Sequence, residues 1–414
     1  MFARSPLLSA LLLVLFNLPA GAADEWPQFR GPNGQGHAVS DGLPLTWSET
    51  ENVKWKCAIA GEGWSSPVVS GNQVWMTTAT EEGKSLRVVS VDLASGKLLA
   101  DAEIFHVEKP ATKNALNSYA SPTPVIEGGR LYVNFGRDGT ACLDAGSGAV
   151  LWKREDITLD HGVGAGSSLA IYKDKLLVPC DGMDVQYLLA LDKQTGKTLW
   201  KTERSYQFTK PADMRKAFST PLAITVNGAD QIVIPTAEHV YAYQPETGKE
   251  IWSAQYLGFS MAPRPVYGNG LVYICTAYGG NAVLAIRPDG TGDVTATHVA
   301  WKTTKQTPTQ SSPVLVGNRL YMVSDSGAVS CLNAVTGADV WRQSIGGKFS
   351  ASLLAAPGRI YFFDRDGTTT VVAAADTFKI LAQNKLESGC MASAAVAGNA
   401  LLLRTKTHLY RLEK

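Results

Sequence analysis

The stretch that most constrains the fold runs from Gln310 to Ser344. It holds four short apolar segments separated by three turn signals, Gly317-Asn318, Asp325-Ser326-Gly327 and Val335-Thr336-Gly337. Short apolar segments joined by such turns are typical of antiparallel hairpins. The stretch therefore predicts one small four-stranded antiparallel sheet. A sheet of this size cannot bury its faces alone, so it needs neighbours of the same kind.

The same unit recurs along the chain. In four ten-residue copies, Gly follows an Asp, Gln or Asn by four residues and Trp follows it by eight; these are residues 143–152, 191–200, 243–252 and 332–341. Degenerate copies lie at 91–100, where Ala100 stands in place of Trp, at 286–301 and at 374–383. The beginning of the unit recurs eight times, from Ser65, Thr123, Ser168, Ser219, Arg264, Ser311, Ser352 and Ser393.

Eight unit starts predict an all-β fold, in which residues 53–414 form a single eight-bladed β-propeller with four-stranded antiparallel blades. Residues 390–414 supply three strands and stop, whereas residues 53–59 read as a strand with no unit of its own. We expect this N-terminal strand to complete the last blade and close the ring, which removes an exposed sheet edge. Trp55 then occupies the position of Trp152 or Trp341 in other blades.

The N-terminus is predicted to be a targeting segment followed by a coil. Residues 1–23 combine Arg4, an apolar run over 7–18 and a small-residue site at 20–22, which is typical of a signal peptide. Residues 24–52 are rich in Gly, Pro and polar residues without periodicity, and we expect a coil packed on the outside of the ring. The signal peptide predicts export, to the periplasm or beyond. Because no other apolar stretch approaches membrane length, we expect no membrane span.

Composition excludes some classes of partner. Hydrophobic residues make up 45% of the chain, charged residues 18%, and the formal net charge is +1. Such a chain is core-rich and has no strong field to attract nucleic acid or an anionic membrane, so we predict neither partner and expect a monomer. The six cysteines are scattered on predicted strands, and we expect most to be free, with a Cys142–Cys180 pair as the alternative.

The motif A-x-D-x-x-T-G-x-x-x-W, complete in residues 190–200, resembles the repeat of pyrroloquinoline-quinone (PQQ) enzymes and their relatives, and it extends over about nine-tenths of the chain after the signal segment. The Gly suits a left-handed turn residue, the Asp or Asn caps that turn, and we expect the Trp to dock on the next blade. Residues assigned to this structural role are Trp55, Trp152, Trp200, Trp252, Trp301, Trp341, Gly148, Gly196, Gly248 and Gly337.

The resemblance implies two different functions. Quinoprotein dehydrogenases of this fold carry a disulfide between adjacent cysteines, bind Ca²⁺ through carboxylates and amides, and use an Asp as base. This sequence has no adjacent cysteine pair and no assignable metal cluster, so we predict no cofactor and no metal, with PQQ plus calcium as the alternative. The chain is also similar to the cofactor-free envelope scaffold BamB, although it lacks the cysteine of a lipoprotein signal. Its start, residues 26–34, looks like that of secreted PQQ-like repeat proteins.

No catalytic residue is assigned from the sequence. Patterns of serine hydrolases, zinc proteases, dinucleotide-binding enzymes and P-loop enzymes are missing, and the six histidines are isolated from one another. One group of residues does suggest a site, because its members precede the first strands of different units and propeller connections converge on one mouth of the channel. This group comprises Asn117, Tyr119, Asp160, His161, Arg215, Lys216, Arg264, Gln310 and Lys348.

Basic, amide and aromatic side chains at this mouth suit an anionic or sugar-like ligand; the alternative is that they satisfy loop carbonyls and solvate a rim. We therefore predict an exported, non-catalytic propeller that binds a protein or cell-envelope ligand through its interblade-loop face. A PQQ-dependent oxidoreductase is one alternative. A hydrolase or lyase at the channel mouth, with Asp160 and His161 as acid and base, is another.

Overall fold

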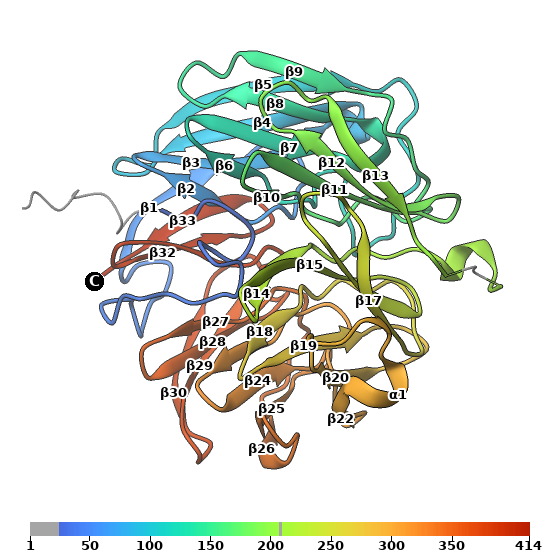
Figure 1. Cartoon of the computed structure of the whole chain (residues 1–414). Coiled ribbons are helices and arrows are strands. Elements are labelled where there is room, and N and C mark those ends of the chain that lie inside the picture. The colour runs from blue at the N-terminus through green and yellow to red at the C-terminus, as the bar shows by residue number, and fades with distance from the viewer. Residues whose placement is uncertain (1–24, 207–208) are drawn as a thin grey trace, which may run out of the picture.

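Eight antiparallel sheets stand around a central channel in the computed structural model, which describes residues 25–206 and 209–414 (Figure 1). Seven sheets have four strands, and one gains a short fifth strand. The predicted all-β, eight-bladed propeller is confirmed, and the largest helix among the described residues has four residues. The predicted signal segment, residues 1–23, lies outside the described residues.

Each blade begins with a short strand next to the channel and ends with a strand on the outside. Blades 1 to 3 contain β2 (Val68–Ser70), β3 (Gln73–Thr80), β4 (Ser85–Asp92), β5 (Leu98–His106); β6 (Val125–Glu127), β7 (Arg130–Asn134), β8 (Thr140–Asp144), β9 (Val150–Arg154); and β10 (Ala170–Tyr172), β11 (Lys175–Asp181), β12 (Gln186–Asp192), β13 (Thr198–Glu203). Blades 4 and 5 contain β14 (Leu222–Val226), β15 (Ala229–Pro235), β16 (His239–Tyr243), β17 (Glu250–Gln255), with β21 (Gly292–Asp293) at its edge; and β18 (Val266–Gly268), β19 (Leu271–Thr276), β20 (Ala282–Ile286), β22 (Val299–Thr303).

Blades 6 to 8 follow the same order. They contain β23 (Val314–Val316), β24 (Arg319–Val323), β25 (Ala328–Asn333), β26 (Asp339–Ser344); β27 (Leu354–Ala356), β28 (Arg359–Phe363), β29 (Thr368–Ala373), β30 (Ile380–Lys385); and β31 (Ala395–Ala397), β32 (Ala400–Arg404), β33 (His408–Leu412), β1 (Val53–Ala58). Short helical segments are α1 (Thr295–His298) and the 3₁₀ turns Glu81–Gly83, Gly136–Asp138 and Ala212–Met214.

The ring is closed by the N-terminal strand, as predicted. β1 pairs antiparallel with β33, in a register that sets Lys56 opposite Tyr410 and Ala58 opposite His408 (Figure 1). The last blade is thus built from both ends of the propeller sequence. Because β33 would otherwise present an open edge, this pairing satisfies its backbone groups and holds the ring shut.

The repeat motif joins each blade to the next. The Trp152 indole N–H donates to the Lys193 carbonyl of the next blade, 3.2 Å away, and its ring covers Gly196, where an added Cβ would lie 2.8 Å from the ring. Gly196 has φ of 71°, a left-handed conformation that glycine adopts without strain. The same arrangement joins Trp55 to the Leu93 carbonyl and Gly96 at the closure of the ring. The regular spacing of Gly and Trp in the repeats therefore places a Trp against the Gly of the next blade.

Two copies of the motif depart from this arrangement for visible reasons. Gly148 has open space beside it, because the preceding blade carries Ala100 where the indole would stand. Trp252 is fully buried and donates to Gln231 of its own blade, 2.9 Å away. The insertion that contains β21 pairs with β17 at this position and accounts for its burial.

The hydrophobic cores lie between neighbouring blades. One core, for example, combines Trp75 and Val88 of blade 1 with Leu131 and Val133 of blade 2. All six cysteines are free thiols, so the alternative of a Cys142–Cys180 disulfide does not hold. Within the described residues, no helix has the length and apolar character that crossing a membrane requires.

Candidate functional site

A ring of hydroxyl groups surrounds the channel where the interblade connections enter the first strands. The Ser66 backbone N–H donates to Thr123 Oγ1 at 3.0 Å, the Thr123 N–H to Ser168 Oγ at 2.9 Å, and the Ser168 N–H to Thr220 Oγ1 at 3.2 Å. On the other side the chain of bonds runs from Arg264 through Ser312, Ser352 and Ser393 back to Ser66, at 2.8–3.1 Å. Seven of the eight blades thus supply a hydroxyl, and the ring lies at one level of the channel.

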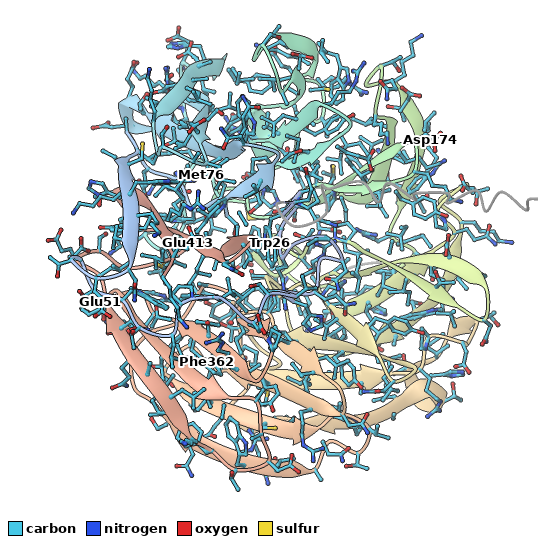
Figure 2. The ribbon with its side chains drawn as sticks, turned by 90° about the vertical axis from the view of Figure 1, so that its left-hand side faces the viewer. Trp26, Glu51, Met76, Asp174, Phe362 and Glu413 are labelled. Carbon is cyan, nitrogen blue, oxygen red and sulfur yellow. The ribbon has the colours of Figure 1, made fainter. Side chains whose placement is uncertain are left out.

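The segment of residues 25–38, which we call the plug segment, crosses the channel next to this ring. Trp26 exchanges two backbone hydrogen bonds with Val69 of β2, and the Ile126 N–H of β6 donates to the Pro27 carbonyl. Further along, His37 contacts the Leu315 carbonyl, and Ala355 bonds to the backbone of Gly36 and Ala38. In Figure 2, Trp26 lies near the centre of the view with blades around it.

Every one of these contacts falls three residues after the hydroxyl-ring position of its blade, so the plug segment lies just beyond the ring, away from the interblade connections. This corrects the expected position of residues 24–52. The first half of that coil spans the channel, while the second half runs along blades 7 and 8, where Trp47 stacks on Tyr361. Backbone pairing to several first strands draws the segment inward, because those strands expose unpaired groups toward the channel.

Arg264 holds the plug segment in place. It stands at the one ring position without a hydroxyl, and its guanidinium donates to the carbonyls of Phe29 and Pro221 and to Gln28 Oε1, at 2.7–3.1 Å. Arg30 lies nearby and donates to the Pro313 carbonyl at 2.5 Å. Burial lowers the pKa of both arginines to about 9, so both remain cations at neutral pH. Arg264 was predicted to lie on the rim, but it is buried and faces the plug segment.

Above the ring the channel widens into a pocket of about 480 Å³ that opens at the interblade-loop mouth. Ring hydroxyls and the Phe29 side chain line its closed end. Its walls are rich in aromatic and apolar side chains, namely Trp64, Leu116, Val163, Phe218, Phe259, Tyr278 and Met391. Among the described residues that line it, Lys216 is the one charged side chain and none is acidic. The pocket is therefore a blind, largely apolar chamber with hydroxyl donors at its base.

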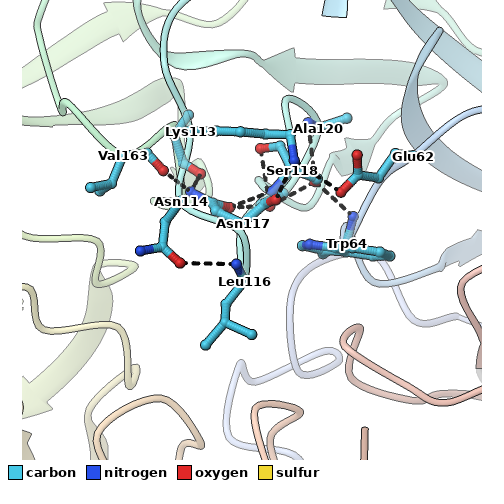
Figure 3. A network of polar contacts seen from close by, with 11 residues as sticks. Glu62, Trp64, Lys113, Asn114, Leu116, Asn117, Ser118, Ala120 and Val163 are labelled. Carbon is cyan, nitrogen blue, oxygen red and sulfur yellow. Dashed lines mark hydrogen bonds and ion pairs between the residues drawn. The ribbon is translucent and has the colours of Figure 1, made fainter. Parts of the chain in front are cut away.

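Three of the nine residues predicted at the mouth line this pocket. Asn117 is one of them, but its amide is fully used by the protein (Figure 3). Its Nδ2 donates to the carbonyls of Val163 and Ala165, and its Oδ1 accepts from the Ser118 N–H and the Ser121 hydroxyl. Asn117 thus fixes the connection after blade 1 to the connection after blade 2, and it shapes the wall that carries Leu116.

Lys216 and Gln310 are the other two. The Lys216 ammonium is buried and donates one hydrogen bond, to the Asp213 carbonyl at 2.7 Å. Gln310 accepts from the Ser350 hydroxyl at 2.6 Å, and its amide nitrogen lies 3.5 Å from the Tyr278 hydroxyl. Both side chains come from connections that precede first strands, which is the placement expected from the sequence.

Asp160 and His161 do not form an acid–base pair. The Asp160 carboxylate accepts from the Gly162 N–H at 2.8 Å, whereas the His161 ring is buried against Phe218 at a centroid distance of 5.1 Å. Burial lowers the pKa of His161 to about 4, so the imidazole is neutral at physiological pH. Its Nε2 has no hydrogen-bond partner among the described residues. The pair therefore offers no geometry for general acid–base catalysis.

The remaining three predicted residues lie outside the pocket. Tyr119 packs over Gly83 of blade 1 beneath the Lys113 ammonium, which is 5.5 Å from its ring centroid. Arg215 donates to the Lys210 carbonyl at 2.8 Å, and Lys348 is exposed.

The aromatic wall and the hydroxyl ring were not predicted from the sequence. Trp64, Phe259 and Tyr278 occupy irregular connections, where no pattern marks them. The ring, in contrast, had a signal: a Ser or Thr stands just before the first strand in seven of the eight recurring unit starts.

The pocket does not fit PQQ with calcium. A calcium site needs several carboxylate or carbonyl oxygens, and the described lining offers no Asp or Glu. No cluster of three or more His, Cys, Asp or Glu side chains in residues 25–206 and 209–414 could hold a metal ion. The arrangement can instead bind a ligand through hydroxyl and ammonium donors and apolar contact.

The sequence matches a known protein family and resembles individual proteins. The family model of outer membrane protein assembly factor BamB matches residues 40–202, 184–295 and 291–403. BamB of Yersinia pestis is 26% identical over 161 residues, which is 38% of this chain and 38% of that protein. Quinohemoprotein alcohol dehydrogenase ADH-IIG of Pseudomonas putida is 29% identical over 142 residues, 31% of this chain and 18% of that enzyme. The matched region thus spans less than half of either relative.

Solved structures agree on the fold. BamB of Moraxella catarrhalis superposes with a TM-score of 0.62 and 12% identity, covering 87% of this chain and 99% of that one. Quinohemoprotein alcohol dehydrogenase of Comamonas testosteroni gives a TM-score of 0.69 and 10% identity, covering 95% and 81%. At these identities the likeness establishes the propeller alone, since one fold hosts many functions.

Proposed function

Because this chain belongs to the family of the outer membrane protein assembly factor BamB, we propose that it is an exported, non-catalytic binding module. It holds a protein of the cell envelope at its interblade-loop face, with the blind pocket at the centre of that face. The name of the family supports a role among envelope proteins, and the predicted signal segment supports export.

The observation that carries this proposal is the apolar rim of the pocket. Leu116 and Tyr278 line the pocket and expose 46% and 45% of their surface. Leu257, which is 64% exposed, lines a smaller hollow that shares Phe259 with the pocket. Large exposed apolar side chains beside a concave, aromatic site are typical of surfaces that bind proteins or ligands. The rigid ring holds these side chains in place, so little ordering entropy is lost on binding.

Site-specific photo-crosslinking in the native envelope tests the proposal. A photoreactive phenylalanine analogue at position 116 and, separately, at position 278 should crosslink to the same envelope protein. Position 199 is the matched control, because Leu199 is 45% exposed on the outer strand of blade 3. The crosslinks from 116 and 278 should disappear in a Trp64→Ala, Phe259→Ala double variant that still folds. Crosslinks of equal strength from position 199, or none from either rim position, would refute the role of this face.

A PQQ-dependent oxidoreductase remains the second candidate, because quinohemoprotein enzymes are similar to this chain. It requires calcium-dependent binding of PQQ in the channel. We expect calorimetric titration with PQQ and Ca²⁺ to show no calcium-dependent heat, since the described pocket lining lacks acidic ligands. Tight binding that disappears on chelation of calcium would favour the enzyme instead.

A further inference from the structure

Five hydroxyl groups at the base of the pocket have a donor to spare. The oxygens of Ser66, Thr123, Ser168, Thr220 and Ser393 each accept a backbone N–H from the neighbouring blade. All five side chains are buried and line the pocket. None of their O–H groups has an acceptor among the described residues, although buried hydroxyls normally find one. Their hydrogens are therefore left to serve a ligand.

The one charged side chain in the described pocket lining, Lys216, is a cation. The Lys216 ammonium uses one of its three donors, on the Asp213 carbonyl, and forms no ion pair with a described carboxylate. Arg264 and Arg30 lie buried below the ring and bond only to carbonyl and amide oxygens. Arg404, also buried, donates to Ser65 and Thr77. With no acid in the described lining, the chamber favours negative charge.

The walls add a second requirement. Trp64, Phe218 and Phe259 present aromatic surface above the hydroxyls, and Phe29 presents an aromatic ring at the closed end. Such walls stabilise an apolar or aromatic body by burial. A sugar suits this site less well, because its many O–H groups need acceptors and the base of the pocket offers mainly donors.

We propose that this pocket binds a carboxylate carried on an apolar or aromatic body. The carboxylate accepts from the ring hydroxyls and from Lys216, while the body packs against the aromatic walls. The inference rests on the proposed function, in that the envelope partner inserts such a group, either an acidic side chain or a chain terminus. A carboxylate accepts hydrogen bonds without donating any, which matches the spare donors here.

A matched pair of small probes tests the inference on the intact exported protein. Binding of 3-phenylpropionate and of its uncharged analogue 3-phenylpropionamide is measured by ligand-observed NMR titration. We expect the acid to bind at least about ten-fold more tightly than the amide, and to weaken with added salt because the attraction is electrostatic. Lys216→Gln should weaken binding of the acid several-fold. Lys348→Gln, which removes an exposed charge from the same face outside the pocket, should leave it unchanged.

A second pair of variants addresses the hydroxyl ring. Thr220→Val removes the O–H while keeping the shape, and Thr220→Ser keeps the O–H. The first should weaken binding of the acid and the second should preserve it. Thr220→Val also removes the acceptor of the Ser168 N–H, so thermal melting is used to check that this variant folds. If Thr220→Val does not fold, the Lys216→Gln result alone tests the carboxylate site.

Equal affinities for acid and amide, no binding of either at about 10 mM, a concentration that detects millimolar dissociation constants, or an unchanged affinity in Lys216→Gln would overturn the inference. The two proposals can fail separately. If the rim crosslinks persist but the acid does not bind, the carboxylate site is wrong and the scaffold role stands. If the acid binds and competes with the crosslink from position 278, the carboxylate belongs to the partner. If it binds where no crosslink forms, the pocket takes a free carboxylic acid and the scaffold role fails.

Discussion

Two glycines in equivalent turns should respond very differently to the same substitution. Gly148 and Gly196 have φ of 74° and 71° and occupy the same place in consecutive copies of the repeat. A Cβ at Gly196 would lie 2.8 Å from the Trp152 ring, whereas nothing lies within 4 Å of a Cβ at Gly148. The contrast arises because Ala100, in the blade before Gly148, leaves that docking position empty.

The structure sets the expected magnitudes. Alanine in a left-handed turn costs about 1–2 kcal/mol at either position, because its Cβ crowds the following carbonyl. At Gly196 the new methyl group must also displace an aromatic ring, and overpacking of this kind costs about 1–3 kcal/mol more. In the Gly196→Ala variant, displacement of the Trp152 ring also disrupts its hydrogen bond to the Lys193 carbonyl. Such a bond contributes about 1 kcal/mol to stability. We therefore expect a loss of about 1–2 kcal/mol for Gly148→Ala and of about 3–6 kcal/mol for Gly196→Ala.

Urea unfolding followed by far-ultraviolet circular dichroism measures both losses, and a double-mutant cycle identifies their origin. In a Trp152→Ala background the extra cost of Gly196→Ala should vanish, since no ring remains to clash with the methyl group. The cost of Gly148→Ala should be the same in both backgrounds. Equal losses at the two glycines, or an extra loss at Gly196 that survives removal of the indole, would refute the docking account.

Three further predictions follow from the same structure. In the parent protein, the imidazole of His161 takes up a proton below about pH 6.5 when unfolded but only near pH 4 when folded, because its burial lowers the pKa. As the pH falls through this window, the parent protein therefore loses up to about 3 kcal/mol of stability. His161→Phe should remove this loss, which urea unfolding at several pH values measures. Arg264→Ser restores a hydroxyl to the ring but removes three hydrogen bonds to the protein, two of them to the plug segment, so trypsin should cleave after Arg30 faster than in the parent protein. Ala100→Trp should fill the space beside Gly148 and raise stability by about 1 kcal/mol, whereas a lower melting temperature would contradict the docking account.

The fold could be predicted because its signals are local and repeated. Turn residues and alternating apolar segments define each hairpin, and the motif ending in Trp200 or Trp341 marks the end of each blade. Counting these units fixed the number of blades. The unpaired strand at residues 53–59 predicted the closure of the ring, because the last unit stops after three strands.

The candidate site was only partly predictable, because a position on a connection does not determine where the side chain points. Lys216 and Arg264 both precede first strands, yet the first lines the pocket and the second turns toward the plug segment. Asn117 lines the pocket with its amide already occupied by Val163 and Ala165. Which donors remain for a ligand depends on neighbours from other blades, and the sequence does not pair them.

The sequence by itself determined the repeating sheets, their number and the joining of the two ends, because these follow from hydrophobic alternation and turn chemistry within about 40 residues. Only the tertiary structure decided that the channel is blind at one end. That depends on the contact of Arg264 with Phe29, 235 residues apart in the chain, and on backbone pairing by a coil without periodicity. The hydroxyl ring shows the division most clearly. Its serines and threonines are visible in seven of the eight copies of the repeat, but their hydroxyl groups come together around one pocket only after the blades have closed into a circle.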